Sequence, residues 1–407
     1  MARIPPVYTR ASALLPDEAR TKDVHKVHIL GADERSRFVA HALSEVYDSV
    51  EIMRWQTPEK YNHLETRNSN RQMTSFEATP PQVSVWDGKD QSHIDHLLVG
   101  GAGHYAMQQL DSIKHRLDKN STVCLMTDGF GVLEDVKRSI FNGTDDSPQF
   151  LLGNLSHNVV FNNRANSLKL LREGQMNVTI PNARTSMRWV KAETLNRKTQ
   201  TRAHFMKALT MPQSLSARST PWDSWFRAKL PTVLFDSIVE PVCVALDVSY
   251  AGLQNNPAAR RMINQLCGEI ARALRAMPDL QRCIGSKRLL DRDWITEFMH
   301  GTIRNKGAAP SRLAGMLKRG VATDADYLTG YFVGKGSAAG VDMRMTRMMW
   351  DMVKAREQIS LERAEEYVPF DATTVPPEES RHVVLPRFAH QAPERKRWPH
   401  SNRPASE

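Results

Sequence analysis

Apolar and polar positions form short alternating blocks over the first part of the chain. Two segments, 36–47 and 104–117, carry apolar residues three and four positions apart, which predicts helices. Four short apolar runs have the length and composition of buried strands: 27–30, 50–53, 96–99 and 122–126. Strands alternating with helices are typical of a doubly wound parallel sheet, whose ligands bind at the carboxyl ends of the strands. We therefore expect an α/β domain over residues 23–187.

From about residue 222 onward the blocks become longer and strand signals become few. Six segments have helical spacing of their apolar residues: 223–249, 257–277, 290–302, 309–319, 324–339 and 341–357. The pattern predicts an all-α domain over residues 222–360. The last segment holds five methionines, and since methionine fills irregular apolar gaps we expect core packing or a homodimer contact there.

Three segments differ in composition from both domains. Residues 1–22 hold four basic residues, and their first acid is Asp17, a composition that resembles a mitochondrial presequence or an ordinary basic tail. Residues 188–221 form a basic connector with Glu193 as its single acid; it is either a solvated loop or an RNA contact in which Trp189 and Phe205 stack on bases. Residues 361–407 are rich in Pro and Arg, and are predicted to be a disordered basic tail.

Composition narrows the class of protein. The 407 residues include 55 Lys and Arg against 45 Asp and Glu, a net charge of +10 that suits a nucleic acid, an anionic cofactor or an organelle matrix. No apolar run is long enough for a membrane-spanning helix. The four cysteines form no C-x-x-C pair, so we expect neither a disulfide framework nor a zinc site, and a reducing compartment. We interpret His93, His96 and His157 as structural, with no metal.

The turn after the first predicted strand is the first candidate binding site. A dinucleotide-binding turn uses G-x-G-x-x-G, because its glycines admit the pyrophosphate and the close helix packing. Here Gly31 is present, but the later positions hold Asp33 and Ser36, and the Asp33 carboxylate would repel phosphates unless Arg35 compensates. Arg54 ends the second strand, where a cation would meet the 2′-phosphate of NADP; the alternative is a solvated surface arginine.

Several short motifs lie in order along residues 25–360: 27–31 with 40–43, Asp128-Gly129-Phe130-Gly131, 153–157, Glu240-Pro241, Asn255-Asn256-Pro257 and 323–330. Together they resemble the motifs of ketopantoate reductase (2-dehydropantoate 2-reductase). The resemblance implies a Rossmann-like N-terminal domain followed by a C-terminal helical domain of the 6-phosphogluconate-dehydrogenase-like kind. It also implies NADP-dependent reduction of 2-dehydropantoate or another 2-keto acid.

The chain departs from this family at the positions that carry catalysis. The family has K-x-x-x-N-x-x-x-N-P on one helix, and alignment on Pro241 places Thr232, Asp236 and Glu240 at the lysine and asparagine positions. Spacing of four keeps the three on one helical face. Two carboxylates there would repel a keto acid. Lys229, three residues before Thr232, is the candidate replacement proton donor.

Other site positions that the resemblance implies also lack the family's amide or cationic side chains. The asparagine of the family's N-G-x-G is Asp128, and the lysine after its third strand falls at about Ala102. The substrate-facing glutamate of T-E-I-D is Asp324, whereas the upstream serine pair falls at Ser311 and Arg312.

Two hypotheses of different classes therefore stand. The first is an NADP-dependent reductase with altered specificity. The second is a catalytically silent mitochondrial binding or regulatory protein that contacts RNA through its basic connector and tails. We interpret the chain as a divergent fungal mitochondrial member, since it also resembles a fungal mitochondrial translational activator of cytochrome b mRNA.

Overall fold

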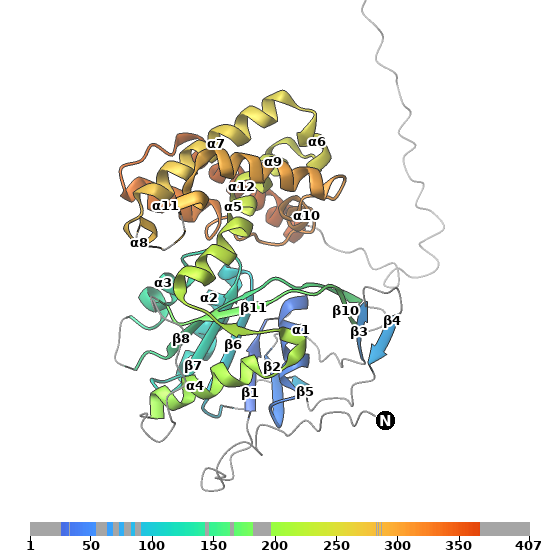
Figure 1. Cartoon of the computed structure of the whole chain (residues 1–407), viewed down its shortest axis with the longest axis vertical. Helices are drawn as coiled ribbons and strands as arrows, with labels where there is room; N and C mark the ends of the chain where they lie inside the picture. Colours follow the sequence, from blue (N-terminus) through green and yellow to red (C-terminus); the bar gives the residue numbers. More distant parts are fainter. Residues whose placement is uncertain are drawn as a thin grey trace, which may run out of the picture. The chain divides into compact units, whose positions relative to one another are not determined.

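An eight-stranded sheet forms the centre of the N-terminal domain in the computed structural model (Figure 1). The structure describes residues 26–31, 33–53, 63–67, 73–76, 83–85, 91–142, 146–162, 167–181, 197–281, 283, 285 and 287–366. The four predicted strands are confirmed as the parallel strands β1 (Lys26–Leu30), β2 (Ser49–Met53), β6 (His96–Gly101) and β7 (Thr122–Thr127). The strand order is β12-β11-β8-β7-β6-β1-β2-β5, so the carboxyl ends of β1, β6 and β7 lie side by side.

Helices cover both faces of this sheet because its strands are apolar on both sides. Leu98 and Cys124 face the core formed with α1 (Glu34–Leu43) and α4 (Arg197–Thr210). Their neighbours Leu97 and Val123 face the core formed with α2 (Gly103–Ile113). Alternate residues of a strand point to opposite faces, so the continuous apolar runs fit a sheet buried on both sides. The expected α/β Rossmann-like fold is thereby confirmed.

Strands β5 (Val83–Val85), β8 (Gln149–Leu155) and β11 (Met176–Thr179) complete the sheet together with β12 (Arg218–Ser219). A second, four-stranded sheet has the order β4-β3-β10-β9. Its strands are β3 (His63–Arg67), β4 (Met73–Phe76), β9 (Asn158–Asn162) and β10 (Ser167–Arg172). It packs beside α1, where the Arg37 guanidinium lies 3.8 Å from the centre of the Phe161 ring.

The described part of the predicted basic connector belongs to this N-terminal domain. Residues 197–210 form α4 against β7, and β12 extends the main sheet beside β11. Phe205 is fully buried and stacks on His96 with ring centroids 4.9 Å apart. The prediction that Phe205 stacks on RNA bases is therefore wrong, because the apolar face of α4 covers the sheet. Trp189, like residues 1–22 and the tail from 367, lies outside the described residues.

The second domain is helical, as predicted. Its central helix is α5 (Trp222–Leu246). Around it lie α6 (Tyr250–Gln254), α7 (Pro257–Ala276), α8 (Pro278–Gln281), α9 (Arg292–Lys306), α10 (Arg312–Lys318), α11 (Thr329–Ala338) and α12 (Arg344–Glu366). The methionines of the segment 341–357 have two kinds of surroundings: Met343, just before α12, and Met349 are buried, whereas Met348 is 46% exposed and Met352 39%. The homodimer stays a prediction.

The described residues show neither a membrane-spanning helix nor a cluster of metal ligands. None of their helices is both long and apolar enough to cross a membrane. They contain no cluster of three His, Cys, Asp or Glu side chains suited to a metal ion, and the four cysteines are free and buried.

A buried carboxylate holds the start of α12 against α7. Glu269 is 5% exposed and accepts hydrogen bonds from the backbone N–H groups of Met345 and Thr346, at 3.1 and 2.8 Å, and from the Thr346 hydroxyl at 2.7 Å. These are N–H groups of a first helical turn, which have no partner within their own helix.

We expect Glu269→Ala to lower the free energy of unfolding by about 2 kcal/mol, because it leaves these buried donors unpaired. Urea denaturation checks the loss. The matched control is Glu297→Ala, exposed on α9, whose effect should stay within about 0.5 kcal/mol. Equal effects of the two substitutions would contradict the capping role.

Candidate functional site

The carboxyl ends of β1, β6 and β7 meet where the N-terminal domain contacts the helical domain. Gly31 follows β1 with φ +141°, and Gly101 ends β6 with φ +87°, conformations that favour glycine. The Asp128 backbone N–H, directly after β7, donates to the Gly101 carbonyl at 3.3 Å. Two residues later, Phe130 donates its N–H to the Tyr327 carbonyl of the helical domain at 2.8 Å.

The turn before α1 is filled by its own side chains. Asp33 is the N-cap of α1, and its carboxylate accepts from the Ser36 backbone N–H at 3.0 Å and from the Ser36 hydroxyl. Ser36 is fully buried against the strand ends, since a Cβ on Gly31 would lie 2.6 Å from its Oγ. The helix N-terminus therefore already holds an anionic group, at the place where a dinucleotide fold receives pyrophosphate.

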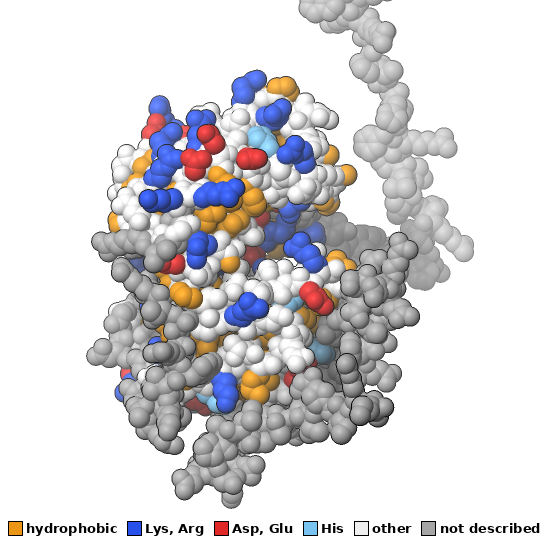
Figure 2. Space-filling view, in the orientation of Figure 1, with side chains coloured by type: hydrophobic (Ala, Val, Ile, Leu, Met, Phe, Trp, Pro, Cys, Tyr) orange, Lys and Arg blue, Asp and Glu red, His pale blue; other side chains and the backbone are white. Residues whose placement is uncertain are grey.

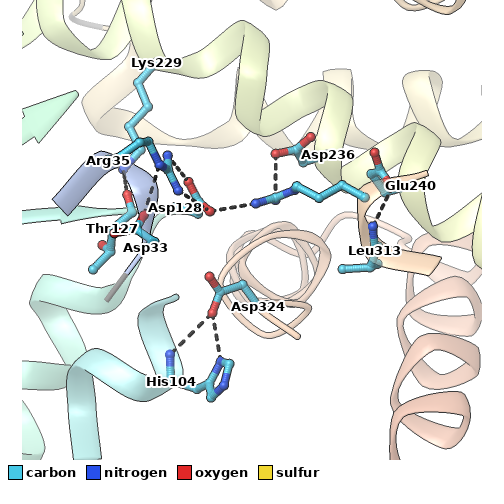
Figure 3. Close-up of polar contacts among 11 residues, drawn as sticks. Asp33, Arg35, His104, Thr127, Asp128, Lys229, Asp236, Glu240, Leu313 and Asp324 are labelled. Carbon is cyan, nitrogen blue, oxygen red and sulfur yellow. Dashed lines mark hydrogen bonds and ion pairs between the residues drawn. The ribbon is translucent and has the colours of Figure 1, made fainter. Parts of the chain in front are cut away.

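Arg35 joins this turn to the end of β7. Its guanidinium makes a bidentate ion pair with Asp128, at 2.7 and 2.9 Å, and its Nε donates to Asp33 at 3.2 Å (Figure 3). The charge of Asp128 raises the pKa of Arg35, which keeps the guanidinium protonated. Arg35, predicted to compensate the Asp33 carboxylate, does contact it.

Arg312 continues the pairing into the helical domain. It is the first residue of α10, and it donates to Asp128 at 2.7 Å and to Asp236 of α5 at 3.0 Å. Burial alone would raise the pKa of Asp128, but Arg35 and Arg312 together hold it well below its usual range. We call the five alternating side chains the charged row: Asp33, Arg35, Asp128, Arg312 and Asp236.

Asp236 and Glu240, the two carboxylates predicted to face a substrate, have different partners in the structure. Asp236 is the last member of the charged row, and burial raises its pKa to about 6, with Arg312 acting in the opposite direction. Glu240 is 1% exposed and accepts from the Tyr250 hydroxyl, from Ser311 at 2.5 Å and from the Leu313 N–H at 3.0 Å. Glu240 thus caps the start of α10 and is enclosed there, and its catalytic role stays a prediction.

Thr232 and Lys229 lie on the same helix with different surroundings. Thr232 is exposed, and its hydroxyl does not carry the positive charge of the lysine that the resemblance implies at this position. Lys229 is 7% exposed and donates to the Thr127 carbonyl, the residue before Asp128, at 2.8 Å (Figure 3). Burial lowers the pKa of Lys229 to about 8.

Asp324 pairs with a histidine that the motifs did not indicate. His104, in the first turn of α2, approaches Asp324 Oδ1 with its Nδ1 at 3.0 Å and donates its backbone N–H to the same oxygen at 3.4 Å (Figure 3). The signal for His104 was its place after a glycine-rich strand end, where ligands bind in parallel sheets. The sequence analysis also did not identify Arg312 as an ion-pair partner. Two carboxylates that lie close together, Asp128 and Asp236, need a nearby cation to compensate their charge.

The predicted site residues are therefore only partly brought together. Arg35, Asp128 and Asp236 lie in one row of ion pairs, Gly31 and Ser36 form the tight turn beside it, and Asp324 lies with His104. Thr232 has no polar partner in the part of the chain that the structure describes. Arg54 lies outside the described residues, so its role toward a 2′-phosphate stays a prediction.

Comparisons with protein families give matches over both domains. Residues 27–184 match the family model described as "Ketopantoate reductase PanE/ApbA". Residues 224–357 match the model "Ketopantoate reductase PanE/ApbA C terminal". A search of curated protein sequences finds no match.

Solved structures support the same architecture. A D-mandelate dehydrogenase solved with NADH and anilino(oxo)acetate has a TM-score of 0.59 at 16% identity, over 82% of this chain and 99% of that one. A probable 2-dehydropantoate 2-reductase from Bacillus subtilis has a TM-score of 0.55 at 16% identity, over 81% and 99%. The dimeric ketopantoate reductase of Staphylococcus aureus has a TM-score of 0.57 at 9% identity, over 82% and 99%. At these identities the likeness shows the fold.

The raised pKa of Asp236 predicts how stability changes with pH. The folded protein holds a proton at Asp236 more tightly than the unfolded chain, so ionised Asp236 costs stability above pH 6. The cost disappears as the pH falls toward the unfolded pKa, near 4. Asp236→Asn removes this titration. We expect its stability relative to the parent to fall by on the order of 2 kcal/mol between about pH 7.5 and 4.5.

Urea denaturation at the two pH values measures this difference. Asp351→Asn, exposed on α12, is the matched control and should show no such change. A pH-independent difference between Asp236→Asn and the parent would contradict the prediction.

Proposed function

Because the chain belongs to the ketopantoate reductase superfamily, we propose that it uses the scaffold of a 2-keto acid reductase as a binding or regulatory protein and does not reduce a keto acid. The observation that carries the proposal is the Asp33 carboxylate, which occupies the N-terminus of α1. A second anionic group has no favourable place there.

The residues of this turn do not fit NADP, the cofactor that the family implies. The pyrophosphate of a dinucleotide needs free N–H groups and a backbone without side chains at the turn. Here the Ser36 N–H is bonded to Asp33, and the Ser36 hydroxyl packs against Gly31. Arg35, the nearest cation, is already engaged by Asp33 and Asp128.

The groups that would act on a keto acid are also committed elsewhere. Asp236 pairs with Arg312, and Glu240 is enclosed by Tyr250 of α6 and by two donors at the start of α10. Thr232 is a weak acid that cannot supply a proton as an ammonium does. The charged row contains three carboxylates and two guanidinium groups, a balance that does not favour an anionic substrate.

RNA remains the macromolecular partner that we propose for a silent scaffold, on the basis of the net charge of +10. On the face shown in Figure 2, Lys and Arg side chains of the described residues are interspersed with acidic and apolar ones. A mitochondrial location rests on the composition of residues 1–22 alone.

The decisive measurement is calorimetric titration of the full chain with NADPH. We expect no binding at micromolar concentrations. Asp33→Gly combined with Ser36→Gly recreates the G-x-G-x-x-G spacing and frees the α1 N-terminus, so the double variant should gain affinity by about tenfold or more. Asp111→Gly, exposed on α2, is the control and should gain nothing. Micromolar binding by the unaltered protein that survives moderate salt would overturn the proposal.

Turnover gives a second, independent test. Incubation of the protein with NADPH and 2-dehydropantoate should leave the nicotinamide absorbance unchanged. If the absorbance falls, the chain is a reductase, and Lys229→Ala then tests whether the displaced lysine donates the proton. Loss of a required proton donor lowers the rate by about 10²–10⁴.

A further inference from the structure

A cavity of about 230 Å³ lies between the domains, behind the loop that follows β7. Its walls come from β7 and β8, from the loop 129–131 and the following helix α3 (Val132–Asp135), and from α5, α8 and α11. Lys229 lines it, whereas Arg35, Asp128, Asp236 and Asp324 do not. The cavity is therefore separate from the charged row, and what it binds does not depend on whether the α1 turn holds a dinucleotide.

Most of the wall is apolar and aromatic. Trp222 and Trp225 are stacked with ring centroids 5.2 Å apart, and Phe130 and Phe226 are stacked at 5.1 Å. Aliphatic side chains such as Leu152 and Leu280 complete the surface. Such a wall fits an apolar ligand body, and large rings on short side chains lose little conformational entropy when they pack on one.

Lys229 is a buried cation of the cavity wall and makes no ion pair with a described residue. Its ammonium makes one hydrogen bond, to the Thr127 carbonyl at 2.8 Å, and has no carboxylate within 4.0 Å among the described residues. It lies 5.1 Å from the Trp225 ring centre and 5.4 Å from that of Phe130. An ammonium carries three donors, and a buried charge without a partner is unfavourable.

Two more cations border the same space. Lys137 and Lys335 line the cavity, against Glu134 as the acid in its wall. Because the lining carries more positive than negative charge, a single negative group on the ligand improves the local balance, and a cationic ligand worsens it.

We propose that this cavity binds a small monocarboxylate with an apolar body, whose carboxylate accepts hydrogen bonds from Lys229 and whose body packs on the aromatic wall. The volume is below the roughly 300–1,000 Å³ of sites for drug-sized ligands, so the ligand has about a dozen non-hydrogen atoms.

The test uses the full chain and three probes of one shape: 4-phenylbutyrate, 4-phenylbutanol and 4-phenylbutylamine. Dissociation constants come from saturation-transfer NMR titrations. The carboxylate should bind about tenfold or more tighter than the alcohol, because a charge-assisted hydrogen bond forms in a largely buried site, and the amine should bind weakest. Equal binding of acid and alcohol, or no binding of either, would overturn the proposal.

Variants then place the ligand. Lys229→Met should abolish the preference for the acid while the alcohol still binds. The control Lys306→Met removes a lysine that lies over the Phe235 and Tyr250 rings outside the cavity, and it should retain the preference. Leu133→Trp narrows the cavity while Lys229 is retained, and it should weaken both ligands, which keeps the test valid if Lys229→Met does not fold. If Arg312→Gln removes acid binding and Lys229→Met does not, the acid occupies the charged row and the proposal fails.

The pH dependence of binding distinguishes an electrostatic role of Lys229 from a packing role, because packing does not depend on the protonation of the ammonium. Lys229 is surrounded by the charges of Asp128, Arg35, Asp324 and Glu134, besides the two lysines of the wall, and its pKa is about 8. Affinity for the acid should therefore fall by about tenfold per pH unit above 8, as the ammonium loses its proton. Affinity for the alcohol should stay constant, and a parallel fall of both would contradict a role for the ammonium.

Discussion

The ion pairs of Asp128 with two arginines are the interaction on which the arrangement of the site depends. A buried carboxylate is unfavourable unless cations and hydrogen bonds compensate it. Arg35 supplies them from the N-terminal domain and Arg312 from the helical domain, so one carboxylate links both. The same loop is held by the N–H of Phe130 on Tyr327 and by Lys229 on Thr127. Loss of either arginine would leave Asp128 buried with half its compensation.

This compensation explains why the departures from the family motifs occur together. Acids at 128 and 236 require a cation between them, and Arg312 stands where the resemblance places a serine. Once Asp33 caps α1, Arg35 is drawn toward the turn as well as toward Asp128. Both arginines of the charged row are paired with carboxylates, so the row no longer offers the unpaired donors that an anionic substrate or a pyrophosphate would use.

The sequence predicted the strands and most helices because their signal is local. Apolar runs set β1, β2, β6 and β7, and three- and four-residue spacing set α5 and α7. Phe205 was misplaced because its helix is polar and basic on average, and only the packed sheet shows which face is covered. Glu240 was correctly placed on one helical face with Asp236, but helical spacing does not say that α10 and Tyr250 enclose it. Arg312 and His104 needed three-dimensional neighbours to acquire a role.

The loop 127–131 separates two environments with opposite properties. On one side Asp128 is saturated with guanidinium partners, and on the other Lys229 is a largely buried cation without a carboxylate partner among the described residues. The resemblance implies a catalytic lysine at Thr232. Its absence removes a positive charge from this region only if no other lysine lies near the loop that follows β7. Here Lys229, about one turn earlier on α5, places its ammonium at Thr127 instead. Helix α5 therefore holds a buried positive charge beside this loop, on the side of the cavity.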